Sequence, residues 1–100
     1  ITNAGSSAVN IKDGASRALA LRVTNANGNF SLANAANAFS GGIVLTTSGA
    51  GTRLSPGTIT AGSYGTGAIT IGESPTDLAG IYFATANQTL SNPIIFNTNF

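Results

Sequence analysis

Short runs of apolar residues, separated by turn-forming clusters, recur roughly every 10 to 12 residues along this chain of 100 residues. Apolar and polar side chains alternate within the runs, as at Leu19–Val23 and Ile69–Ile71. Such alternation is typical of β-strands, because successive side chains of a strand point to opposite faces. The clusters between the runs, such as those at 48–51 and 55–57, contain the Gly, Pro and Ser residues of turns. The sequence therefore predicts an all-β fold.

The shortness of the strands and turns favours a solenoid over a sandwich. The turns are small and polar, and Asn is frequent in them, where it tolerates left-handed backbone angles and can stack in ladders. Only 7% of the residues are aromatic, and there is no Trp. We therefore expect a single-stranded parallel β-helix of about four to five coils, with ~20 to 25 residues and ~4.8 Å of rise per coil. An antiparallel, pilin-like β-sandwich is the alternative.

Charged side chains are scarce, at 7% of the residues where about 25% is usual. None occurs from Val23 to Thr52 or from Leu78 to Phe100. Since a free monomer relies on surface charge for solubility, we expect a chain that is shielded by assembly or is extracellular. The net charge of +1 is too small for nucleic-acid binding, and no apolar run approaches the ~18 residues of a membrane helix.

The chain contains no His and no Cys, which excludes Ser-His-Asp and Cys-His catalysis as well as disulfides. Its three acids are Asp13, Glu73 and Asp77. Glu73 and Asp77 flank Pro75 in one predicted turn and form a candidate pair for glycoside hydrolysis. A solvated turn with Asp77 as a local cap is the simpler interpretation. We expect no enzyme activity, no cofactor and no metal site.

A few further residues are candidates for binding or modification. Lys12 is expected to form a surface pair with Asp13, with an isopeptide bond to an Asn as the alternative. The triplet Thr58–Thr60 has the T-x-T form of ice-binding solenoids, although one triplet is not an array. Tyr64 and Tyr82 could stack on sugars, and Tyr82 is expected to point outward because it alternates with apolar neighbours.

Residues 36–54 read ANAFSGGIVLTTSGAGTRL and resemble the autotransporter-associated β-strand repeat, whose N-x-[YF]-[ST]-G-G motif precedes a turn and a short G-T-L strand. The matching positions are Asn37, Phe39, Ser40, Gly41, Gly42, Gly51, Thr52 and Leu54. Arg53 departs from the motif as an insertion before Leu54. The segments 65–71 and 90–96 also resemble strands of this family. The resemblance implies a right-handed parallel β-helix in exported bacterial proteins, usually in tandem and without catalytic residues.

The order of these segments suggests a repeating array. In the family, the L-S-N-P-I strand precedes the N-x-F-S-G-G motif, whereas here it lies near the C-terminus. Joining Phe100 to Ile1 restores the order, so we expect residues 1–100 to be one period of a longer tandem or stacked solenoid. The sequence shows no capping helix or charged end, and uncapped units should stack. We expect Ile94, Phe96, Phe100 and Ile1 at the joint, and Phe39, Ile43 and Leu45 in the interior.

The sequence therefore predicts a structural unit of an extracellular bacterial fibre or surface stalk, whose partners are copies of itself. Successive units are joined either covalently or by contact. Two alternatives stay open. One is a pilin-like subunit polymerised by donor-strand exchange. The other is a carbohydrate-binding β-helix module of an adhesin or phage protein, with surface glycans as its partner.

Overall fold

The structure of the chain is a computed structural model that describes residues 5–7, 10–24, 28–32, 36–46, 52–54, 63–82 and 87–98. These residues form eight β-strands and contain no helix, so the predicted all-β class is confirmed. Consequently, they contain no helix that could cross a membrane. The strands are β1 (Gly5–Ser7), β2 (Leu21–Thr24), β3 (Gly28–Leu32), β4 (Ile43–Thr46), β5 (Thr52–Leu54), β6 (Ile69–Ile71), β7 (Ala79–Ile81) and β8 (Ile94–Phe96).

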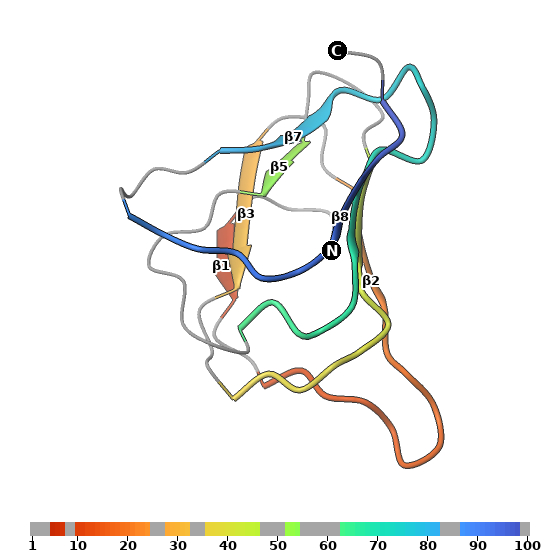
Figure 1. Cartoon of the computed structure of the whole chain (residues 1–100), viewed down its shortest axis with the longest axis vertical. Helices are drawn as coiled ribbons and strands as arrows, with labels where there is room; N and C mark the ends of the chain where they lie inside the picture. The colour runs from red at the N-terminus through yellow and green to blue at the C-terminus, as the bar shows by residue number, and fades with distance from the viewer. Residues whose placement is uncertain are drawn as a thin grey trace.

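Successive strands alternate between two sheets. The odd-numbered strands form one sheet in the order β1-β3-β5-β7, and the even-numbered strands form the other in the order β2-β4-β6-β8. Figure 1 looks at the two sheets from the side of β7 and β8, with the odd sheet on the left and the even sheet on the right. All six strand pairs are parallel, which does not fit the antiparallel sandwich that the sequence left open.

The register repeats along both sheets with a nearly constant step. Paired residues differ by 22 positions at the shortest step, from Leu21 to Ile43, and by 27 at the longest, from Thr52 to Ala79. This step is slightly longer than the 20 to 25 residues expected. Because each residue pairs with its counterpart one step later, side chains of equivalent positions lie above one another in columns.

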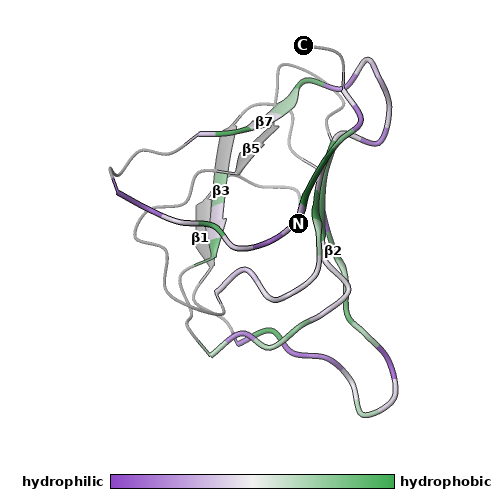
Figure 2. Cartoon of the chain, viewed as in Figure 1, coloured by the Kyte–Doolittle hydropathy of each residue, from purple (hydrophilic) through white to green (hydrophobic). Residues whose placement is uncertain are grey.

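The core lies between the two sheets and is built from these columns. In the even sheet, Val23 pairs with Leu45, Leu45 with Ile71 and Ile71 with Phe96. The first three of these side chains are completely buried. Their β-branched or branched aliphatic shape suits a pleated, half-buried surface. Figure 2 shows the apolar colouring concentrated on the even strands, whereas the turns to the lower and upper right are polar.

The interior residues predicted from the sequence motif are confirmed. Phe39, Ile43 and Leu45 are buried, and they belong to one core cluster with Phe30, Leu32, Tyr64, Ile69, Ile71 and Val23. Leu54 ends β5, where its backbone pairs with Phe30 and Ile81. Ile1, Phe100 and the triplet Thr58–Thr60 lie outside the described residues.

The two motif glycines sit at a corner where neighbouring layers of backbone approach closely. A Cβ atom on Gly41 would lie 2.6 Å from the carbonyl carbon of Leu19, which is closer than two such atoms can be. Gly42 has a φ of +87°, a left-handed conformation, and a Cβ there would meet the backbone of Ala68. Only glycine satisfies both conditions without distortion. The S-G-G motif thus lets the chain turn into β4 directly beside the corners before and after it.

Candidate functional site

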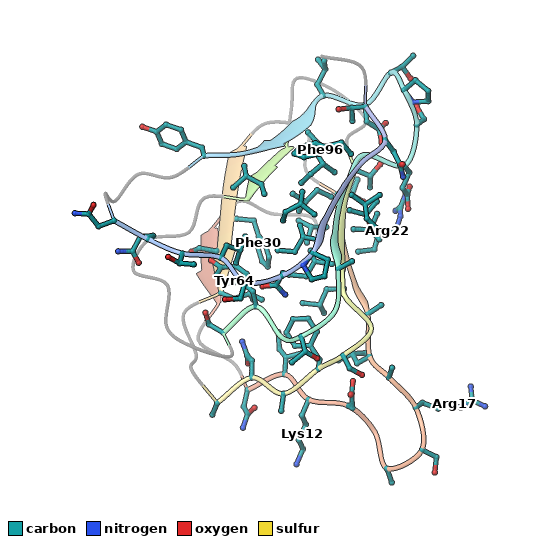
Figure 3. All side chains as sticks on the ribbon, in the orientation of Figure 1. Lys12, Arg17, Arg22, Phe30, Tyr64 and Phe96 are labelled. Carbon is teal, nitrogen blue, oxygen red and sulfur yellow. The ribbon has the colours of Figure 1, made fainter. Side chains whose placement is uncertain are left out.

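The last strand of the even sheet leaves apolar side chains exposed. Phe96 occupies the fourth position of the column whose other members are Val23, Leu45 and Ile71, and those three have exposed fractions of 0%. Phe96 itself is 58% exposed. The reason is that β8 pairs with β6 on one side only, so no further strand of the described chain covers this position. Figure 3 shows Phe96 between the two sheets, on the side nearest the viewer.

Other large apolar side chains are exposed at this same end of the sheets. They follow or belong to the last two strands or the turn before them, and they are Leu78, Tyr82 and Ile95. We call these three residues together with Phe96 the tail. No residue from 78 to 98 carries a charge, so the tail is an uncharged apolar surface. Such a surface is typical of an interaction site.

The opposite end of the even sheet, at β2, is different. Val23 is fully buried although β2 also pairs on one side only. The exposed groups at this end are Leu19, with an exposed fraction of 38%, and the side chain of Arg22. We call Leu19 and Arg22, together with the outer edge of β2, the head. The two ends of the sheet therefore present different chemistry.

Arg22 of the head is bound by a carboxylate of its own chain. Its Nε donates to Oε1 of Glu73 at 2.7 Å, and its Nη2 donates to Oε2 at 2.6 Å. Its Nη1 also donates to Oγ1 of Thr24 at 3.0 Å. The hydrogen bond from Arg22 is the main reason why the pKa of Glu73 lies below its ordinary value. This two-pronged ion pair connects β2 with the turn that follows β6 (Figure 3).

The turn of residues 72–77 is organised by Asp77, as the sequence predicted for a local cap. Oδ2 of Asp77 accepts hydrogen bonds from the backbone N–H of Glu73 at 2.7 Å and of Ser74 at 3.3 Å. The same oxygen accepts from Oγ1 of Thr46 at 3.0 Å, which ties the turn to β4. The pKa of Asp77 is lowered, mainly by the Glu73 N–H. Both acids of the candidate hydrolytic pair thus have structural partners.

Asp13 ties a surface loop to the glycine corner. Its Oδ1 accepts from the backbone N–H of Leu19 at 2.6 Å and of Ser40 at 3.0 Å, and its Oδ2 accepts from Oγ of Ser40 at 2.6 Å. The Ser40 hydroxyl is the largest cause of a lowered pKa of Asp13. The sequence predicted a pair with Lys12 instead, because the Ser40 partner lies 27 residues away in the chain.

Tyr64 is a core residue, so its proposed role in sugar stacking is wrong. Its ring is buried between the sheets (Figure 3), and its hydroxyl oxygen accepts a hydrogen bond of 3.2 Å from the backbone N–H of Leu32. Burial raises the pKa of this phenol. Tyr82 is 54% exposed, which confirms that it points outward.

Asparagine side chains connect backbone groups of successive layers. Oδ1 of Asn37 accepts from the N–H of Ile11 at 2.8 Å, and its Nδ2 donates to the carbonyl of Ser63 at 2.8 Å. The sequence predicted ladders of stacked Asn residues. The structure shows Asn37 bridging backbone groups 26 residues before and 26 residues after it. The motif contained the signal for this residue but not its bonding pattern.

Comparison with known proteins adds no assignment to these observations. No protein-family model, no curated protein and no solved structure matches this chain. Among the described residues there is no group of three or more His, Cys, Asp or Glu side chains that could hold a metal ion. The fold therefore defines the class of the chain as an all-β protein built from parallel strands, and the tail is its candidate functional surface.

Proposed function

We propose that this chain is a structural unit of a β-solenoid, a right-handed single-stranded parallel β-helix, and that its units assemble end to end. The strand order supports the solenoid, because each strand pairs with the strand two places further along the chain. The nearly constant step of the register supports it as well, since a coil of fixed circumference requires such a step.

The observation that carries the assembly is the exposure of Phe96. In a stack of parallel strands, every inner column position is buried by the layers on both sides, as Leu45 and Ile71 are. Addition of one more strand to β8 would bury Phe96 in the same way. Burial of such an aromatic side chain stabilises an interface by about 1.5 to 3 kcal/mol.

The register is compatible with joining copies in tandem. If Phe100 were followed directly by Ile1 of a second copy, the step from Ile94 to the next Leu21 would be 27 residues. The corresponding step from Ile81 to the next Gly5 would be 24 residues. Both values fall within the range of 22 to 27 found inside the chain. Covalent and contact-mediated joints therefore require the same pairing.

The low charge of the chain and its resemblance to exported repeats support an extracellular fibre or surface stalk of a bacterium, with copies of itself as partners. In this proposal the protein has no catalytic role. Donor-strand exchange between sandwich subunits is not supported by the parallel pairing. Binding of surface glycans has one exposed aromatic side chain in its favour, Tyr82.

Fibre diffraction or helical reconstruction of the concentrated protein tests this proposal. We expect a strong meridional spacing of ~4.8 Å, the distance between paired strands, and an axial repeat of roughly 19 Å for four layers. A clearly longer repeat without meridional order at 4.8 Å would contradict stacked layers. A protein that stays monomeric at all concentrations would contradict assembly itself.

A further inference from the structure

We propose that the joint between units is strictly head to tail, and that Arg22 of one copy binds the acidic turn of residues 72–77 of the next. This inference rests on the proposed end-to-end assembly. It adds the polarity of the joint, its register and a charged contact that selects the correct orientation.

The position of the acidic turn in the sheet is the first argument. Within one copy, Arg22 lies on β2, and the turn follows β6, two strands away in the order β2-β4-β6-β8. When β2 of a second copy adds to β8, its Arg22 is again two strands from β6. Each distance is roughly 9 to 10 Å along the stack. Arg22 spans that distance within one copy, where it reaches Glu73 at 2.6 Å.

The side chains between these positions leave room for the contact. In the register of the sheet, Arg22 of the second copy would lie over Ile95, just as Arg22 lies beside Val44 within one copy. Ile95 is 46% exposed, so its surface is available to the stem of the arginine. The guanidinium would then lie level with Thr70, which directly pairs with Ile95.

The charge of the turn is the second argument. It carries two carboxylates, Glu73 and Asp77, and the ion pair of the described residues gives it one guanidinium. Oδ2 of Asp77 accepts from backbone N–H groups and a hydroxyl, all of which are neutral. The turn therefore keeps one excess negative charge. In a head-to-tail stack, arginines from both sides flank each turn, and charges alternate along the axis.

The other two orientations lack this complementarity. A tail-to-tail contact would place two acidic turns near each other, with only the β8 strands between them. A head-to-head contact would place the two Arg22 residues on adjacent strands. Like charges in such positions oppose association and favour the alternative arrangement. A head-to-tail contact joins two different surfaces and does not close, so it generates an open filament.

Two blocked variants test the polarity. Leu19→Asp places a charge in the head, and Phe96→Asp places one in the tail; both positions are exposed, and circular dichroism verifies folding. We expect each variant to be monomeric alone, and their mixture to form 1:1 dimers without longer species in sedimentation velocity. Dimers of Leu19→Asp alone would reveal tail-to-tail pairing, and dimers of Phe96→Asp alone would reveal head-to-head pairing. Either result would overturn the inference.

The same mixture isolates the charged contact. In this dimer, the Phe96→Asp partner supplies the head, and the Leu19→Asp partner supplies the tail. Arg22→Met in the head-supplying partner should weaken the dimer about two- to fivefold, and the difference should disappear at ~0.5 M salt. Arg22→Met in the tail-supplying partner is the matched control, since it removes the internal ion pair but not the contact. Equal effects in both partners would overturn the role of Arg22.

The outcome separates this inference from the proposal on which it rests. If the unmodified chain never associates, the proposed assembly is wrong, and the polarity falls with it. If the unmodified chain forms filaments with 4.8 Å order but the mixture of blocked variants polymerises or stays monomeric, assembly stands and the head-to-tail joint is wrong.

Discussion

Val23 and Phe96 occupy the same column of the same sheet, at its two ends, yet one is completely buried and the other is largely exposed. Both belong to edge strands that pair on one side only. The difference shows that an edge strand need not have an exposed inner face. At β2 the chain covers the inner face of its own edge strand, and at β8 it leaves this face open. The open end is therefore the part of the molecule with the most to gain from a partner.

The largest contrast between interior and open end is expected at Ile71 and Phe96. Ile71→Ala should lower the free energy of unfolding by about 2 to 5 kcal/mol, because it leaves a cavity in a fully buried column. Phe96→Ala should cost less than about 1 kcal/mol in the monomer, since its side chain is mostly in water already. Urea unfolding at a concentration where the protein is monomeric measures both.

Equal losses at the two positions would mean that Phe96 is covered in the monomer, and the difference between the ends would disappear. A loss at Phe96 that grows with protein concentration would instead indicate that association buries it.

The next contrast concerns glycine at an inner corner and in an edge strand. Gly42→Ala should cost about 1 to 3 kcal/mol, because a Cβ there meets the backbone of Ala68 and φ is left-handed. Gly80→Ala, in β7, should change stability by less than about 0.5 kcal/mol, since no atom lies within 4 Å of its Cβ position. Thermal unfolding of the two variants makes the comparison, and a tolerated Gly42→Ala would contradict the tight corner.

A third contrast pairs the two tyrosines. Tyr64→Phe removes the acceptor of the Leu32 N–H inside the core, and we expect a cost of about 1 to 2 kcal/mol. Tyr82→Phe removes a hydroxyl from an exposed ring at the tail, and we expect a change within about 0.5 kcal/mol. Chemical denaturation measures both. A neutral Tyr64→Phe would indicate that the hydrogen bond contributes little to the core.

The strands and the interior side of the motif could be predicted from the sequence because both depend on local patterns. Alternation at Ile69–Ile71 specifies a strand with two buried faces of the pattern, and the S-G-G motif specifies a corner beside Phe39 and Ile43. Such signals are contained within a few residues. They are independent of which other strand lies alongside.

The partners across layers could not be predicted, because they are separated by one or two full steps of the register. Arg22 and Glu73 are 51 residues apart, and no local pattern relates them. Tyr64 lies in a Tyr-Gly-Thr-Gly segment that is typical of an exposed turn, and only its hydrogen bond to Leu32 allows the polar ring to be buried. The tail was partly predicted, since Ile94 and Phe96 were expected at the joint before their exposure was known.

The smallest contrast is in the response to acid, which should act on the inner layers and not on the uncharged tail. Direct hydrogen bonds lower the pKa of Asp13, Glu73 and Asp77, whose ordinary values are 3.8, 4.5 and 3.8. The unfolded chain therefore takes up protons at a higher pH than the folded chain. The stabilisation is complete above about pH 5 and is lost as the pH falls through the ordinary and then the lowered pKa values.

Melting temperatures measured from pH 7 to pH 2 test this response. We expect a nearly constant value down to about pH 5 and a progressive decrease below it. Asp13→Asn should reduce the acid-induced decrease, because it removes the carboxylate that binds Ser40 and Leu19. Arg17→Gln, in the same loop and without a carboxylate, is the matched control and should keep the full decrease. If both variants behaved alike, the carboxylate bonds between layers would not be the source of the acid sensitivity, and the inner layers would be held by apolar packing alone.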